Sequence, residues 1–196
     1  MKFVPDDDDD TLPSWRQRPK PVGFEIAYRL DGDELVIDST RKVDRVKLGA
    51  IEQVRFTFDP GNISGRGYKV RLTLTDGKRI TFGNLSWRSM VDVERDDPRY
   101  RAFLEKLCPA IAAANPKCVF VAGKPTALWL AFTTITAVSL LGMAAFALFA
   151  FSQSRYPAMW ISLGLLAATI WQMEPLVRLN APKALATGEV PAWLVP

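Results

Sequence analysis

The chain has 196 residues, with 25 Lys and Arg against 21 Asp and Glu, a formal net charge of +4, and no histidine. The lack of histidine removes the most common general base and the most common zinc ligand. The two cysteines, Cys108 and Cys118, have no second pair with which to build a metal site, so we expect reduced, partly buried thiols. The composition therefore predicts no catalytic residue, no cofactor site and no metal site, and it disfavours an enzyme.

Residues 1–21 predict a disordered, acidic and proline-rich tail. The aspartates of Asp6–Asp10 repel one another, and an unfolded acidic run holds a divalent cation weakly and without fixed geometry. We expect a solvated tail, and folding back onto the basic domain behind it is left open. Residues 1–24 contain no apolar stretch of the kind found in secretory signal peptides. Prolines interrupt regular structure at Pro5, Pro13, Pro19 and Pro21.

After residue 22, apolar residues recur at every second position, which is typical of β-strands. The alternation is clear over Phe24–Leu30, Val54–Phe58 and Tyr68–Thr75. The sequences Asp31-Gly32-Asp33 and Asp76-Gly77 are typical of tight turns between neighbouring strands. The pattern predicts five or six consecutive antiparallel strands.

Two irregular positions interrupt this pattern. Ile51 is out of phase with Val54 by one residue, which predicts a β-bulge. The stretch Gly61–Gly67 is glycine-rich, and such loops can present backbone N–H groups to a phosphate. However, no Lys-Ser/Thr pair follows it and the next element is a strand, so a hairpin loop is the better interpretation.

The periodicity then changes to that of an amphipathic helix. Apolar residues recur at three and four positions between Tyr100 and Ile111, after a start signal at Asp96-Asp97-Pro98. Pro109 is expected to kink or divide this helix, and Asn115-Pro116 to end it. Val119–Val121 then predicts a last short extended segment. Residues 22–121 are therefore expected to form one β domain with a C-terminal helix.

Two long uncharged segments follow. No charged residue occurs from residue 125 to 154 or from residue 156 to 173. An α-helix rises about 1.5 Å per residue, so about 20 residues are needed to cross a hydrocarbon core of about 30 Å. Residues 126–151 and 156–173 are therefore predicted to be two transmembrane helices that form a hairpin.

Basic residues flank the hairpin on the side of the two termini, whereas the loop between the spans carries Arg155 alone. This bias predicts a multi-pass protein of the inner (plasma) membrane with both termini in the cytoplasm. The spans contain no ionisable residue, which argues against a transporter acting alone. Small residues four positions apart suit packing of the hairpin against itself, and a homodimer is left open. The flanking residues are Lys106, Lys117, Lys124, Arg178 and Lys183.

Residues 174–196 form a proline-rich apolar tail. It is too apolar for a solvated end, so it is expected to lie along the membrane interface, on the chain's own domain, or in a partner, with the first two favoured. Trp193 is the natural anchor, because its ring suits an interface or a pocket.

Residues 11–125 carry 21 Lys and Arg against 14 Asp and Glu. A domain held at the cytoplasmic leaflet faces anionic headgroups, which attract basic side chains. An ordinary solvated surface remains the alternative, and nucleic acid is disfavoured because no aromatic side chains are interleaved on the outward strand faces. The candidate lipid or partner contacts are Arg66, Lys69, Arg71, Lys78, Arg79 and Trp193.

Strands in a meander followed by one helix resemble a pleckstrin-homology-like split barrel. Residues 23–115 resemble the cytoplasmic pleckstrin-homology-like domains of uncharacterised bacterial membrane proteins with a two-helix transmembrane hairpin. The resemblance implies an α+β fold, with an antiparallel meander or split barrel capped by a helix and followed by the hairpin. The segments that carry the resemblance of the domain are Tyr28-Arg29-Leu30, Asp33–Ile37, Ile51–Val54 and Leu72–Phe82. The tail segments Asn180-Ala181-Pro182 and Val190–Pro196 are in turn similar to the ends of uncharacterised bacterial two-span membrane proteins, which implies no activity.

These features predict a membrane-anchored, non-enzymatic interaction module whose cytoplasmic domain binds a protein partner or anionic lipid headgroups. The alternative is an accessory subunit of a larger inner-membrane complex, packed through its hairpin. A hydrolase or transferase needs a nucleophile beside a base, and no such constellation is visible in the sequence.

Overall fold

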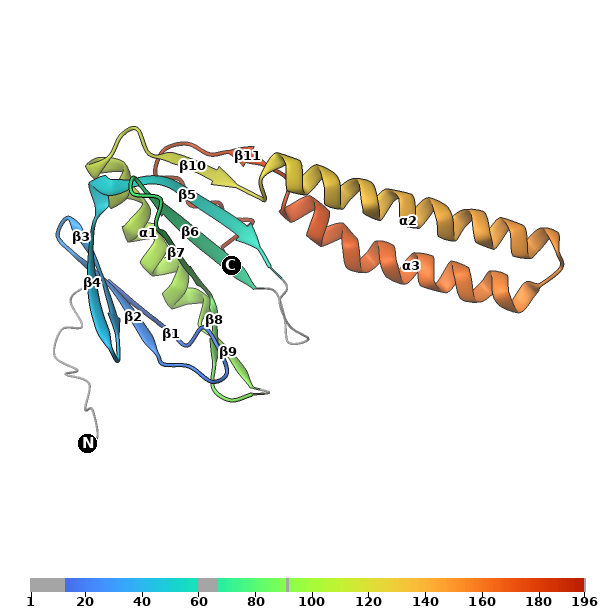
Figure 1. Cartoon of the computed structure of the whole chain (residues 1–196), viewed down its shortest axis with the longest axis horizontal. Helices are drawn as coiled ribbons and strands as arrows, with labels where there is room; N and C mark the ends of the chain where they lie inside the picture. The colour runs from blue at the N-terminus through green and yellow to red at the C-terminus, as the bar shows by residue number, and fades with distance from the viewer. Residues whose placement is uncertain (1–12, 60–66, 91, 196) are drawn as a thin grey trace. The chain divides into compact units, whose positions relative to one another are not determined.

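The computed structural model describes residues 13–59, 67–90 and 92–195. Within these residues the fold is α+β, with antiparallel sheets followed by three α-helices, two of them long and apolar (Figure 1). The chain divides into two compact units. One consists of Met1–Val121 together with Ala184–Pro196, and the other of Ala122–Lys183.

The first sheet is a meander in which each strand pairs antiparallel with the next one in the chain. It contains β1 (Ser14–Gln17), β2 (Ile26–Asp31), β3 (Glu34–Ser39) and β4 (Lys42–Lys47), in that order. The predicted tight turn at Asp31-Gly32-Asp33 joins β2 to β3, and a short 3₁₀ turn, η1 (Leu48–Ala50), leads from β4 into the second sheet.

The expectation of a disordered tail over residues 1–21 is wrong for Ser14–Gln17. This strand alternates exposed and buried side chains, and Trp15 packs edge-on against Tyr100 with ring centroids 5.2 Å apart. The strand is held by its pairing with β2 and by its two buried side chains, Trp15 and Gln17, and the nearby prolines flank it without entering it. The acidic run Asp6–Asp10 lies outside the described residues.

The second sheet has the order β11 (Lys183–Ala184), β10 (Val119–Ala122), β5 (Ile51–Phe58), β6 (Tyr68–Leu74) and β7 (Arg79–Gly83). The strands β5, β6 and β7 form a second antiparallel meander. The register of β5 on β6 shifts next to the start of β5, which confirms the predicted bulge.

A small two-stranded sheet, β8 (Leu85–Trp87) and β9 (Val93–Arg95), leads into the helix α1 (Asp97–Ala114). The side chain of Asp96 accepts a hydrogen bond from the backbone N–H of Arg99, which caps the helix. Pro109 lies inside α1 and does not divide it, so of the two expected effects the division is wrong. The helix ends at Asn115, as predicted.

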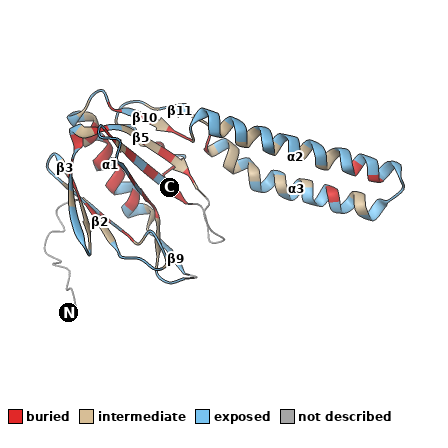
Figure 2. Cartoon of the chain, in the orientation of Figure 1, coloured by how far each residue is buried: buried red, intermediate tan, exposed pale blue. Residues whose placement is uncertain are grey.

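The core lies between the two sheets and α1, and the inner side chains of all three are buried (Figure 2). Phe82 of β7 stands at its centre, with ring centroids 4.8 Å from Tyr28, 6.0 Å from Phe103 and 6.3 Å from Tyr100. Burial of one such side chain contributes about 1.5–3 kcal/mol. The aromatic cluster therefore joins the first sheet, the second sheet and α1 into one core.

The second unit is dominated by α2 (Thr126–Ser152) and α3 (Tyr156–Leu179). Both helices are long and apolar enough to cross a membrane, by length and composition. The indole N–H of Trp129 donates to the carbonyl of Val177 (2.9 Å), which ties the two helices together near their chain ends. The helix α3 extends beyond Met173, where the uncharged segment ends.

The segment that precedes α2 and the segment that follows α3 lie side by side. The backbone N–H of Lys124 donates to the carbonyl of Asn180 (3.0 Å). Gly123 has φ +84°, and a Cβ atom there would lie 2.3 Å from the carbonyl oxygen of Ala181. Only glycine fits this combination of left-handed backbone and close approach.

The segment after β11 packs on the unit that contains α1. Leu185 donates its N–H to the carbonyl of Phe120 (3.0 Å), and Leu194 and Val195 are each 1% exposed. A Cβ atom at Gly188 would lie 3.2 Å from the nearest α1 side chain. Of the three destinations expected for the apolar tail, the structure shows the chain's own domain.

Candidate functional site

The strands β5, β6 and β7 bury one face and expose the other. Val54, Phe56, Val70, Leu72 and Ile80 point into the core. Side chains alternate along a strand, so the residues between them point outward. We call this outward side the basic sheet face. It consists of Gln53, Arg55, Thr57, Lys69, Arg71, Thr73, Arg79 and Thr81.

The register of the strands arranges this face in rows. Arg71 on the middle strand lies directly opposite Arg55 on one side and Thr81 on the other. Directly opposed residues of an antiparallel pair have Cβ atoms about 4.5–5.5 Å apart. One row therefore holds two guanidinium groups and a hydroxyl, and Lys69 and Arg79 belong to the rows on either side.

The two arginines of the central row affect each other. Partial burial lowers the pKa of Arg55, and the positive charge of Arg71 lowers it further. Like charges placed directly opposite each other on a sheet are destabilising. An anion placed over this row relieves that repulsion, because both guanidinium groups can donate hydrogen bonds to it.

Three basic residues of the first sheet, Arg29, Lys42 and Arg45, lie within 4 Å of carboxylates, and so does Lys69 of the basic sheet face. Lys69 binds Asp59 (2.6 Å), but Arg71 and Arg79 form no ion pair with any residue that the structure describes. This leaves positive charge on the second sheet. The first-sheet pairs are Arg29–Asp38 (3.7 Å), Lys42–Asp44 (2.6 Å), and Arg45 with Glu34 (3.3 Å) and Asp31 (3.6 Å).

The structure brings three of the six predicted contact residues together on this face: Lys69, Arg71 and Arg79. Lys78 lies in the preceding turn, and its ammonium group is 3.6 Å from the carboxylate of Asp44. Trp193 is 43% exposed in the C-terminal segment. Arg66 lies outside the described residues.

Arg55 was not among the predicted contacts, although it lies between Val54 and Phe56 and alternation alone places it on the outward side. Its pairing with Arg71 depends on the strand register, which the sequence does not reveal.

The two thiols are poor nucleophiles in this fold. Burial raises the pKa of Cys108 to about 12 and that of Cys118 to about 11. Both side chains are therefore protonated at neutral pH, and both are buried. Over residues 13–59, 67–90 and 92–195, no three His, Cys, Asp or Glu side chains gather in a way that could hold a metal ion.

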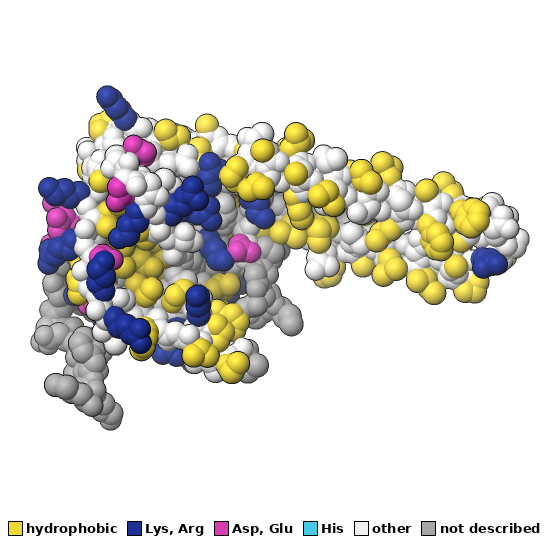
Figure 3. Space-filling view, viewed as in Figure 1, with side chains coloured by type: hydrophobic (Ala, Val, Ile, Leu, Met, Phe, Trp, Pro, Cys, Tyr) yellow, Lys and Arg dark blue, Asp and Glu magenta, His cyan; other side chains and the backbone are white. Residues whose placement is uncertain are grey.

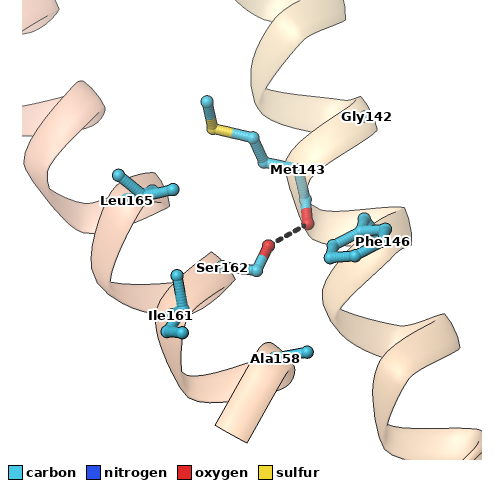
Figure 4. A pocket seen from close by; sticks show the side chains of 7 residues that line it. All are labelled: Gly142, Met143, Phe146, Ala158, Ile161, Ser162 and Leu165. Atoms are coloured by element: carbon cyan, nitrogen blue, oxygen red, sulfur yellow. Dashed lines mark hydrogen bonds between the residues drawn. The ribbon is translucent and has the colours of Figure 1, made fainter. Parts of the chain in front are cut away.

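The surface of α2 and α3 has a different character. It is covered mainly by hydrophobic side chains, whereas Lys and Arg gather over the strand-containing unit (Figure 3). An apolar groove of about 400 Å³ runs between the helices, and at its floor the Ser162 hydroxyl donates to the carbonyl of Met143 (Figure 4). The lining side chains offer no titratable group, so the groove suits apolar contact and not chemistry.

No family model matches this chain, and no curated protein matches it at a significant level.

Proposed function

We propose that this chain is a membrane-anchored, non-enzymatic interaction module. In this proposal α2 and α3 form a transmembrane hairpin with both termini in the cytoplasm of a bacterial cell. A pleckstrin-homology-like domain then presents the basic sheet face to anionic lipid headgroups.

The strand order supports the pleckstrin-homology-like part of the proposal. A four-stranded meander is followed by a three-stranded meander and then by one helix whose apolar side packs on both. This is the arrangement expected of a split barrel closed by a helix.

The exposed apolar surface of α2 and α3 supports the hairpin. Their most apolar windows have mean hydropathies of 2.0 and 1.2, yet only 11% and 6% of those windows are buried within the chain. A core helix of a water-soluble protein hides its apolar side chains. At about 1.5 Å per residue, helices of 27 and 24 residues are longer than the roughly 30 Å of a hydrocarbon core.

The single observation that carries the lipid part is the pair Arg71 and Arg79. Both are exposed, and neither has an ion-pair partner among the described residues, whereas Arg29, Lys42 and Arg45 of the first sheet each have one. Each basic residue near an anionic membrane surface contributes roughly 1 kcal/mol of attraction. Arg71 and Arg79 together therefore favour a weak, salt-sensitive contact.

The test measures how closely the domain approaches lipid headgroups. The full chain carries the substitution Ala102→Cys, an exposed position of α1, and a donor dye on that cysteine, since the two native thiols are buried. It is placed in nanodiscs that contain a headgroup-labelled acceptor lipid, with or without phosphatidylserine. We expect more energy transfer with phosphatidylserine at low salt, and we expect this gain to fall as salt screens the charges.

Two matched double variants distinguish an effect of the basic sheet face from an effect of net charge alone. Arg71→Gln with Arg79→Gln should abolish the phosphatidylserine-dependent transfer. Arg29→Gln with Arg45→Gln removes the same charge from the first sheet and should leave most of it. Equal transfer in neutral and anionic discs at low salt, or equal loss in both variants, would exclude a lipid-binding role for this face.

A second candidate is an accessory subunit of a larger inner-membrane complex. The exposed apolar side chains of α2 and α3 favour it, because helices of another protein can cover them as well as lipid can. Purification in mild detergent distinguishes the two. A stoichiometric membrane protein that is retained by a variant lacking the phosphatidylserine response supports the accessory role.

A further inference from the structure

The basic sheet face is a grid of hydrogen-bond donors. No position of the grid holds a carboxylate, and every side chain in it can donate a hydrogen bond. The face therefore suits an anion that offers several acceptor oxygens at once. Its three rows across β5, β6 and β7 are Gln53 with Thr73 and Arg79, Arg55 with Arg71 and Thr81, and Thr57 with Lys69 and Gly83.

The central row is the one that brings two guanidinium groups together. Arg55 and Arg71 are directly opposed, and the hydroxyl of Thr81 stands on the other side of Arg71. Arg55 is half-buried and Arg71 is exposed. Burial removes part of the water around the Arg55 guanidinium, and the charge of Arg71 repels it, so both effects lower the pKa of Arg55. A bound anion offsets both effects, whereas each of the other rows holds only one cation.

Charge and geometry together select the kind of anion. A phosphomonoester carries close to two negative charges at neutral pH and offers three terminal oxygens. It can therefore neutralise both guanidinium groups and bind each of them through a pair of N–H groups. A carboxylate or a phosphodiester carries one charge and two free oxygens, so it neutralises one arginine and leaves part of the repulsion in place.

The shape of the face favours a phosphate at the outer end of a lipid headgroup. The rows consist of strand residues on a pleated surface, and no loop stands among them. A terminal phosphomonoester is the outermost group of its lipid. The phosphodiester of phosphatidylserine lies beneath the serine that it links to glycerol, so a sheet surface reaches it less readily.

We propose that Arg55, Arg71 and Thr81 form a site for the phosphomonoester headgroup of a membrane lipid, phosphatidic acid being the simplest example, and that this row selects such a lipid over phosphatidylserine. The selection rests on the proposed function, because it requires the basic sheet face to meet the membrane. Lys69 and Arg79 in the neighbouring rows attract any anionic surface. The two opposed arginines supply the preference.

Energy transfer in nanodiscs measures the preference. The full chain with its dye on Ala102→Cys is placed in neutral discs, in discs with phosphatidic acid, and in discs with enough phosphatidylserine to give the same zeta potential. The transfer gives the ratio of chains near the headgroups to chains far from them. We expect this ratio to be about ten-fold higher with phosphatidic acid than with charge-matched phosphatidylserine, which is the effect of one additional hydrogen bond to a charged group.

Lysine variants distinguish the planar guanidinium group from its charge. Arg55→Lys with Arg71→Lys keeps the net charge but removes the paired N–H groups, so transfer with phosphatidic acid should fall to the level of phosphatidylserine. Arg29→Lys with Arg45→Lys makes the same change on the first sheet and should keep the preference. Loss of the preference in both variants, or in neither, would overturn the assignment to the central row.

The lipid series tells the failure of this site from the failure of the proposed function. Equal transfer in the two charge-matched discs, above that in neutral discs, would overturn the selection and support the lipid-binding function. Transfer no higher than in neutral discs with either lipid would refute both.

Soluble glycerol 3-phosphate carries the same group without a membrane. The lipid and the site are held at one bilayer, with an effective concentration on the order of millimolar, so we expect glycerol 3-phosphate to compete only above roughly that concentration. Competition at micromolar concentration would overturn the lipid as the source of the phosphomonoester and assign the row to a soluble ligand.

Discussion

Buried amide side chains fix one corner of the domain. Asn84 is fully buried, and its side-chain oxygen accepts the backbone N–H of Tyr68 (2.8 Å) while its amide nitrogen donates to Asp97 (2.7 Å). The side-chain oxygen of Gln17 likewise accepts a hydrogen bond from the backbone N–H of Gly83. These two side chains connect β1 to β7 and the start of β6 to the first turn of α1.

We predict that Asn84→Leu lowers the free energy of unfolding by about 1–3 kcal/mol for each buried polar group left without a partner. Leucine has as many side-chain heavy atoms as asparagine, so the loss does not arise from a cavity. Thermal unfolding in detergent, followed by tryptophan fluorescence, measures it. Thr75→Val, at an exposed position, serves as the control and should melt like the natural sequence. Equal melting temperatures for the two variants would contradict this role of Asn84.

The sequence predicts where most basic residues of the site point, but not which of them are neutralised. Alternation around Val70 and Leu72 places Lys69 and Arg71 outward without any structure. Lys78 and Arg79 are neighbours in sequence, yet only Lys78 reaches the carboxylate of Asp44. That ion pair joins different sheets, so it depends on tertiary packing and cannot be inferred from local pattern.

At the level of elements, length determines what the sequence can predict. The strands β5 and β6 have eight and seven residues, and their alternation is long enough to be recognised. The strands β1, β8 and β9 have four, three and three residues, and so few positions do not establish a period. The strand β1 pairs with β2 and also packs Trp15 against Tyr100 of α1, which is a contact between residues distant in sequence.

Prolines lie inside two helices, and α3 also extends beyond its predicted end at Met173. Pro109 lies within α1 and Pro175 within α3. A proline removes one backbone hydrogen bond, and packing can compensate for this. At Pro109 the C-terminal segment lies close by, with a Cβ atom at Gly188 only 3.6 Å from the proline Cα. In α3 the Glu174–Arg178 ion pair (2.6 Å) spans the turn that contains Pro175.

The C-terminal segment is a structural part of the domain, and we predict that Leu194→Ala destabilises it. Leu194 is 1% exposed, and truncation of a buried leucine costs about 2–5 kcal/mol. The melting temperature of the purified protein should fall accordingly. Thr187→Ala changes an exposed residue of the same segment and should have little effect. Deletion of Val190–Pro196 should destabilise the protein at least as much, and unchanged melting of the deletion variant would refute the prediction.

At the scale of the whole molecule, charge distribution makes the proposed orientation testable. The loop between α2 and α3 carries only Arg155, whereas Lys117, Lys124, Arg178 and Lys183 flank the other ends of the helices. Positive residues are retained in the cytoplasm. The loop is therefore expected outside the inner membrane and the strand-containing unit inside.

We predict that a cysteine introduced by Ser154→Cys reacts with a membrane-impermeant maleimide in intact cells, whereas one introduced by Ala102→Cys reacts only after lysis. Both positions are exposed, and the native thiols are buried, so the labelled band reports the new cysteine. Labelling of Ala102→Cys in intact cells, with Ser154→Cys protected, would reverse the orientation.

The unit that contains both sheets is discontinuous along the chain, since Ala184–Pro196 belongs with Met1–Val121. A ribosome adds roughly 5–20 residues per second. The segment Ala122–Lys183 must therefore be translated, over some seconds, before the residues that cover α1 are made. During this interval the apolar surface beneath Leu194 is open to chaperones and proteases. The domain can therefore finish folding only after the helix pair has been synthesised. A nascent chain whose hairpin fails to insert can be degraded before the C-terminal segment packs on α1.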